Sequence, residues 1–158
     1  MTTIQLSNTD ARLVYLSIQY HLARPGSELD PMTKQPGAHG LAEVARGLEP
    51  QLERAVATIE LSDQQRQRLV SAIAGAINEL KSSPLLAGGG RSMVPAFQET
   101  LRRLFPEAAD DPDEATQLAG HLLALRRRLE QIELTPAGES DTTATRRRRW
   151  RFWERSGT

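Results

Sequence analysis

The chain has 158 residues, no cysteine, and twenty Lys and Arg residues that balance twenty Asp and Glu residues. This length suits one domain with its own hydrophobic core, and the lack of cysteine excludes disulfide bonds, thiolate metal sites and cysteine nucleophiles. No charge-free run exceeds eleven residues, whereas a membrane-spanning helix needs about 20 apolar residues, so we expect no transmembrane helix. The start, MTTIQLSNTD, lacks the basic and apolar regions of a secretory signal, and we therefore expect a cytoplasmic protein.

The zero net charge conceals an uneven distribution along the chain. Residues 144–158 contain six Arg and one Glu, a net charge of +5, and the remaining residues therefore carry −5. An acidic body with a basic extension suggests a contact with nucleic acid, with a membrane or with another protein.

Apolar residues recur at helical spacing in five segments, and we see no sustained alternation of the kind that marks a half-buried strand. The first helix is expected from about Asn8 to Arg24, because the following Pro25 and Gly26 disfavour helical geometry. The second is expected over residues 41–60, with a kink or a break at Pro50.

The third predicted helix opens at Ser62, whose hydroxyl and the Gln65 side chain match a capping box. A lysine near its end, Lys81, suits the negative pole of the helix dipole. The fourth predicted helix is short, spans residues 92–105, and is expected to be closed by Pro106.

The fifth predicted helix, at residues 111–134, carries the clearest signals. Asp111 is a suitable N-cap and Pro112 a suitable first helical residue. Its apolar seam consists of Leu118, Leu122, Leu125, Leu129 and Ile132. The seam covers two heptads, which is compatible with packing inside the domain or with a homodimer through this helix. His121 precedes a seam leucine and is expected at the edge of the core.

These segments predict an all-α, single-domain bundle of about five helices over residues 1–134. Residues 135–145 are small and polar without periodicity, which is typical of a linker. Residues 146–158 then form a basic, aromatic tail that we expect to be disordered on its own.

A sixteen-residue loop at 25–40 is the first candidate site, since loops of this length tend to be functional or mobile. It contains Glu28, Asp30 and His39, and His21 lies on the preceding predicted helix. Two imidazoles and two carboxylates could bind a divalent metal. The spacing matches no metal motif, so a surface loop is the preferred interpretation and a metal-dependent enzyme the alternative. No cofactor is expected.

Two further patterns could contact phosphate. The glycines and arginine of Gly88–Arg91 precede the fourth predicted helix, but the complete phosphate-loop pattern is absent and a hinge is preferred. Arg66 and Arg68 on the third helix and Arg126–Arg128 on the fifth could suggest a helix-turn-helix module. Because the turn at Glu60–Asp63 has no glycine and the body is acidic, a plain helical hairpin with solvated arginines is preferred.

The C-terminal tail is the remaining candidate. It holds both tryptophans of the chain, and the residues expected to bind an anionic surface are Arg146, Arg147, Arg148, Arg149, Trp150, Arg151, Phe152 and Trp153. Arginines are attracted to anionic lipid and tryptophans prefer the headgroup boundary. The same residues could neutralise the phosphates and stack on the bases of single-stranded nucleic acid. Docking on the acidic body, contact with a partner protein and a tail without a role are further alternatives.

The sequence thus favours a non-enzymatic binding or adaptor protein. Its helical body would contact a protein partner or a second copy, and its tail would contact a membrane or nucleic acid.

Overall fold

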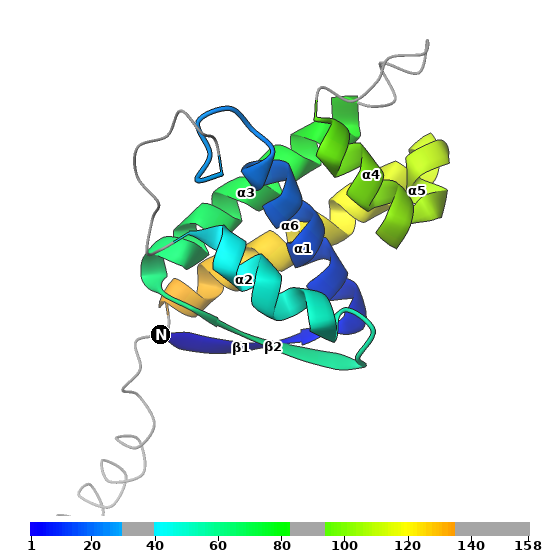
Figure 1. Cartoon of the computed structure of the whole chain (residues 1–158). Helices are drawn as coiled ribbons and strands as arrows, with labels where there is room; N and C mark the ends of the chain where they lie inside the picture. Colours follow the sequence, from blue (N-terminus) through cyan, green and yellow to red (C-terminus); the bar gives the residue numbers. More distant parts are fainter. Residues whose placement is uncertain (30–39, 83–93, 135–158) are drawn as a thin grey trace, which may run out of the picture.

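The computed structural model describes residues 1–29, 40–82 and 94–134. The elements in chain order are β1 (Thr2–Ser7), α1 (Asn8–Leu22), α2 (Leu41–Leu48), the 3-10 helix η1 (Glu49–Gln51), β2 (Val56–Leu61), α3 (Asp63–Ser82), α4 (Pro95–Leu104), α5 (Pro106–Asp110) and α6 (Pro112–Leu134). Helices dominate this single domain, as predicted, and the predicted linker and tail lie outside the described residues (Figure 1).

The largest difference from the expected fold is a small antiparallel sheet. Strands β1 and β2 pair with Ile4 opposite Ile59 and Gln5 opposite Thr58. Alternate residues of each strand are buried, and the others form an exposed outer face. The expectation that the chain contains no strand was wrong, because each strand is too short for its alternation to stand out in the sequence.

The predicted helix over residues 41–60 is wrong in its second half. α2 ends at Leu48, and Pro50 lies in η1, where its missing N–H is harmless because the first residues of a helix have no internal acceptor. The chain then turns into β2. Asn8 holds this turn by donating from its side-chain amide to the carbonyls of Leu52 (2.6 Å) and Arg54 (2.9 Å).

The capping box at the start of α3 is present as predicted. The amide N–H of Gln65 donates to the Ser62 hydroxyl (3.2 Å), and the amide N–H of Ser62 donates to the Gln65 side chain (2.9 Å). The residues before it belong to β2 and not to a helix. The proposed helical hairpin at Glu60–Asp63, and the helix-turn-helix alternative built on it, are therefore wrong.

α1 is the central helix, and residues 13–18 are all buried. Six consecutive buried residues require neighbours on every side, and α1 packs against α2, α3 and α4. The predicted leucine seam of α6 is also buried, with Leu118, Leu122, Leu125 and Leu129 in the core and the helix packed against α3. At its start, Asp111 accepts a hydrogen bond from the amide of Asp113 (2.8 Å), which confirms the predicted cap.

The end of the predicted fourth helix also differs. α4 ends at Leu104, and Pro106 is the first residue of a further short helix, α5. This position suits proline, because a first-turn residue donates no intrahelical hydrogen bond. His121 is exposed and not at the edge of the core. Within the described residues, none of the helices combines the length and apolar character needed to cross a bilayer.

A candidate binding groove between α2 and β2

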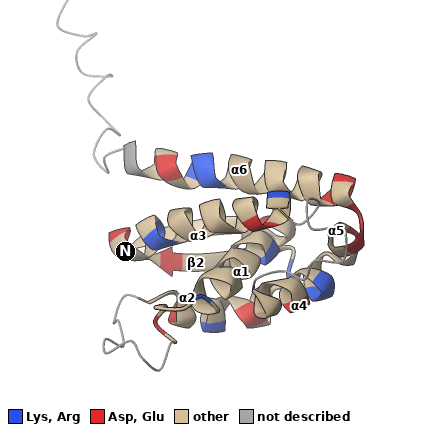
Figure 2. Ribbon diagram, turned by 90° about the horizontal axis from the view of Figure 1, so that it is seen from above, with Lys and Arg blue, Asp and Glu red and all other residues tan. Residues whose placement is uncertain are grey.

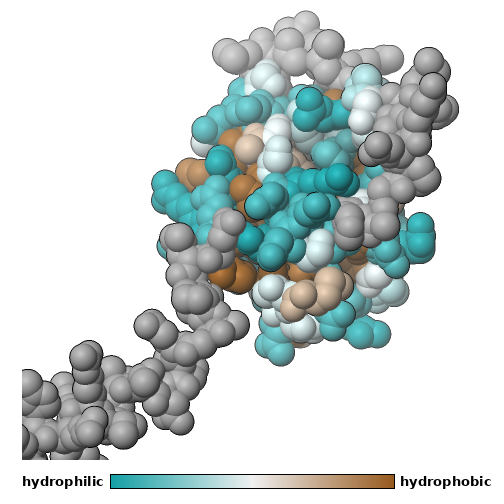
Figure 3. Space-filling model, turned by 90° about the vertical axis from the view of Figure 1, so that its left-hand side faces the viewer, coloured by the Kyte–Doolittle hydropathy of each residue, from teal (hydrophilic) through white to brown (hydrophobic). Residues whose placement is uncertain are grey.

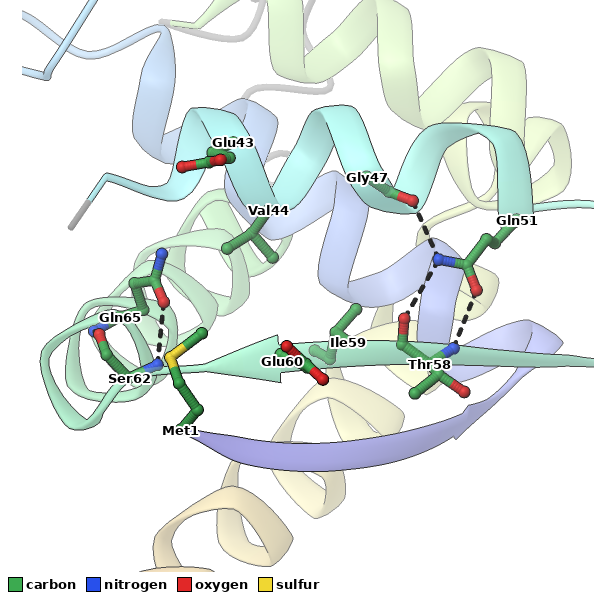
Figure 4. Close-up of a pocket in the computed structure, with 10 residues that line it drawn as sticks. All are labelled: Met1, Glu43, Val44, Gly47, Gln51, Thr58, Ile59, Glu60, Ser62 and Gln65. Carbon is green, nitrogen blue, oxygen red and sulfur yellow. Dashed lines mark hydrogen bonds between the residues drawn. The ribbon is translucent and has the colours of Figure 1, made fainter. Parts of the chain in front are cut away.

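The candidate site is built on the outer edge of β2, the edge that faces α2 (Figure 4). The Gln51 side chain lies against this edge. Its amide nitrogen donates to the Thr58 carbonyl (3.1 Å), and its amide oxygen accepts from the Thr58 N–H (3.0 Å). The same nitrogen donates to the carbonyl of Gly47 on α2 (2.9 Å). Gln51 therefore occupies the place that the backbone of a third strand would take.

Beyond Gln51 the edge of β2 is open. Both polar backbone groups of Thr58 point away from β1, and in an antiparallel ladder every second residue points the same way. Glu60, two residues further on and opposite Thr3, therefore directs its own N–H and C=O toward α2. Neither group has a hydrogen-bond partner among the residues that the structure describes.

A pocket of about 460 Å³ occupies this part of the edge. This volume is within the range of about 300–1,000 Å³ typical of ligand sites. Its lining residues are Met1, Glu43, Val44, Gly47, Gln51, Thr58, Ile59, Glu60, Ser62 and Gln65. Figure 4 shows Val44 of α2 and Ile59 of β2 on facing elements, with the Met1 side chain at the open end.

The pocket is acidic. Glu43 and Glu60 are exposed, and no Lys or Arg side chain is among the lining residues. Elsewhere the charges are mixed, and Figure 2 shows basic and acidic residues interspersed over the body. The face shown in Figure 3 is similarly mixed in hydropathy, with small hydrophobic patches among hydrophilic residues. A ligand with positive charge and a backbone-like donor and acceptor would therefore complement the groove.

The start of α2 is fixed over the groove by Glu28. Its carboxylate accepts from the amides of Leu41 (2.6 Å) and Ala42 (2.9 Å), which would otherwise lack acceptors at a helix start. A Cβ at Gly40 would overlap the same carboxylate, so a side chain there would displace it from the helix start. The side-chain amide of Gln65 also donates to the Gly40 carbonyl (3.2 Å), and so joins the starts of α2 and α3.

The proposed metal site of the 25–40 loop gains no support from these contacts. Glu28 caps α2, while Asp30 and His39 lie outside the described residues. Burial lowers the pKa of His21, and the nearby Glu28 opposes this shift. In the part of the chain that the structure describes, no three His, Asp or Glu side chains are grouped so that they could hold a metal ion.

Three of the arginines considered for phosphate binding have contacts within the folded domain. Arg66 is buried and donates to the Leu129 carbonyl of α6 (3.4 Å). Arg126 pairs with Glu130 (2.9 Å), and Arg128 pairs with Asp10 of α1 (2.8 Å). The glycine-rich segment Gly88–Arg91 and the tail residues 146–153 lie outside the described residues.

A second pocket, of about 400 Å³, lies where α1, α5 and α6 meet. Phe105, Pro106 and Leu118 contribute apolar surface, and Glu107 and Glu114 contribute carboxylates. The exposed His121 is also at this pocket. No strand edge is open here, because all the lining residues lie on helices or next to them.

Sequence reasoning missed the groove between α2 and β2. The one sequence signal for β2 is the alternation of Ala57, Ile59 and Leu61, which is too short to distinguish a strand from a helix. Comparison of the chain with protein-family models, with curated proteins and with solved structures found no match.

Proposed function

We propose that this chain is a non-enzymatic binding or adaptor protein whose tail, residues 146–153, binds the surface of an anionic membrane. One observation carries the proposal: both tryptophans and six of the arginines lie in residues 146–155. A tail that served only solubility would not need large aromatic rings. The helical body would provide the contacts to other proteins, and we place the protein in the cytoplasm.

The charge of the tail is sufficient for reversible membrane binding. Each arginine near an anionic lipid surface contributes about 1 kcal/mol, so the net charge of +5 corresponds to about 5 kcal/mol. Trp150 and Trp153 add to this, because tryptophan prefers the boundary between headgroups and acyl chains. The attraction weakens with salt, since the charges act over a Debye length of about 10 Å at 0.1 M.

The burial of the α6 seam is the reason why the proposal uses the tail and not α6 as the contact surface. A homodimer through α6 would have to use the exposed side of the helix, because its leucine seam is buried against α3. Among the residues of α6 whose side chains the structure describes, Leu123, with 36% of its surface exposed, is the exposed large hydrophobic residue. The metal-dependent enzyme is not favoured by any contact in the described residues, since Glu28 is already engaged.

The test uses the full chain and vesicles of neutral lipid with or without phosphatidylserine. Brominated acyl chains quench tryptophans that enter the bilayer, so quenching reports the tail directly. We expect quenching only with the anionic vesicles, and less of it at higher salt. Equal quenching by neutral and anionic vesicles, or no quenching by either, would refute binding to an anionic membrane.

Matched substitutions separate the tail from the body. Arg148→Gln combined with Arg149→Gln should weaken vesicle binding by about 2 kcal/mol, or roughly 30-fold. Arg102→Gln with Arg127→Gln removes two exposed arginines of the body and should change vesicle binding little. Equal effects of the two pairs would contradict the role of the tail. Salt-sensitive quenching by single-stranded nucleic acid, without vesicle binding, would identify nucleic acid as the target instead.

A further inference from the structure

The open edge of β2 has a defined chemical preference. Gln51 shows that a single amide group can bind the N–H and C=O of Thr58 together (3.0 and 3.1 Å). Glu60 offers the same pair of groups one repeat further along the strand. An extended peptide directs the N–H and C=O of every second residue to the same side. Strand addition to a sheet edge is a recurring mode of peptide recognition. The groove is therefore suited to an extended segment.

We infer that the occupant is the tail of the same chain, with residues 149–152 added as a strand beside Glu60 in the groove between α2 and β2. In an extended segment, Arg149 and Arg151 point to one side while Trp150 and Phe152 point to the other. This alternation matches that of β2, where Glu60 lies on the exposed face and Ile59 on the buried one.

The two sides of such a strand meet complementary surfaces. The arginines reach the carboxylates of Glu43 and Glu60, the acidic residues among those that line the pocket. The rings lie toward Val44, Ile59 and Met1. Methionine makes favourable contacts with aromatic rings, and the Met1 side chain is exposed.

The chain is long enough to reach the groove. α6 ends at the same end of the molecule as the N-terminus in Figures 1 and 2, and Met1 lines the pocket. Fifteen residues separate Leu134 from Trp150, which allows about 50 Å when extended and about 20 Å as an average coil. Such tethering gives a high effective concentration, typically millimolar for a short flexible connection.

Docking would compete with membrane binding, because the same arginines and rings are used for both. Only this regulatory consequence rests on the proposed function, since the docking itself can be observed without lipid. The protein would then hold its tail on its own body until an anionic surface displaces it.

Amide hydrogen exchange in the full chain tests the docking. The Glu60 N–H should exchange at least about tenfold more slowly in the natural chain than in Arg149→Gln combined with Arg151→Gln, because the tail supplies its acceptor. The Thr58 N–H is the internal reference, since Gln51 protects it in both proteins. Equal exchange of Glu60 in the two proteins would overturn the inference. Protection that appears only at high protein concentration would also overturn it, because the occupant would then be the tail of a second copy.

Tryptophan quenching by acrylamide tests the role of the carboxylates. Glu43→Gln with Glu60→Gln should expose the tail to acrylamide and raise its apparent affinity for anionic vesicles about threefold or more, in proportion to two surface ion pairs. The matched control is Glu107→Gln with Glu114→Gln, which removes two carboxylates from the second pocket. If the control has the same effect, the tail is held by general charge attraction and the groove assignment fails.

The two proposals can fail separately. Protection of Glu60 without vesicle binding would leave the docking intact and refute the membrane function. Vesicle binding with an unprotected Glu60 and no effect of the groove substitutions would refute the docking and leave the membrane function intact.

Discussion

Gly75 in α3 offers a sharp test of the packing between α1 and α3. Glycine inside a helix is about 1 kcal/mol less favourable than alanine, so propensity alone predicts that Gly75→Ala stabilises the protein. The structure predicts the opposite. A Cβ at Gly75 would overlap Cε1 of Tyr20 and lie 3.0 Å from its Cζ. The Tyr20 ring would have to move away from Phe97, against which it packs edge to face with centroids 5.7 Å apart.

The size of the effect follows from these opposing terms. Overpacking costs about 1–3 kcal/mol, and loss of the aromatic pair costs about 0.5–1.5 kcal/mol, against a gain of about 1 kcal/mol in helix propensity. We expect Gly75→Ala to lower the free energy of unfolding by about 1–2 kcal/mol. Gly120→Ala in α6 is the control, because a Cβ there meets nothing within 4 Å, and it should raise that free energy by about 1 kcal/mol.

Urea denaturation of the two variants, followed by circular dichroism, measures both values. A stabilisation of Gly75→Ala equal to that of Gly120→Ala would show that Tyr20 does not lie against α3 as described. It would refute the close approach of α1 and α3 on which the core depends.

Three further substitutions test the site and its supports. Gln51→Leu should lower the free energy of unfolding by about 1–2 kcal/mol, because the backbone groups of Thr58 lose their partner. Gln64→Leu, at an exposed residue, is the control. Equal losses in the two variants would argue against the hydrogen bonds between Gln51 and Thr58. Ser62→Ala removes one of the two hydrogen bonds of the capping box and should lower the free energy of unfolding by about 1 kcal/mol. An unchanged midpoint in thermal or urea unfolding would mean that the cap contributes nothing. Burial lowers the pKa of His21 below its ordinary value of 6.5, so the unfolded chain binds a proton more readily than the folded one. The stability that neutral His21 contributes should be complete above about pH 6.5 and should fall as the pH drops below that value. His21→Gln should reduce this pH dependence between pH 5 and 7.5, and an identical dependence in the variant would contradict the assignment.

The helices could be predicted where local signals agreed with the packing. In α6 the Asp111 cap, Pro112 and the leucine spacing all indicated one helix, and the core uses that same leucine face. The start of α3 was predictable for the same reason, since a capping box is a contact between residues three apart. These features are encoded in short segments and need no knowledge of the tertiary fold.

The strands could not be separated from helices on the same basis. β1 has two buried apolar residues, Ile4 and Leu6, which is too few to establish a period. In β2 the apolar residues Val56 and Ile59 are also three apart and fit a helical face, although only Ile59 is buried. The pairing of β1 with β2, about fifty to sixty residues away, decides between the two conformations.

The groove required the tertiary structure. Nothing in the sequence indicates that Gln51 binds the backbone of Thr58, or that Glu28 caps a helix thirteen residues later. The alternative of a metal site groups Glu28 with Asp30 and two histidines, because carboxylates that cap helices and carboxylates that bind metals look the same in a sequence. The tail stays a prediction, because its signal is its composition and its residues lie outside the described structure.

Quenching of the tail tryptophans by brominated lipid in anionic vesicles, measured on the full chain at two salt concentrations, tests the central claim most directly. The proposed membrane contact predicts clear quenching at low salt, less at high salt, and little with neutral vesicles. Tryptophans that remain unquenched in the presence of excess anionic vesicles, for the natural chain and for Glu43→Gln with Glu60→Gln alike, would contradict it.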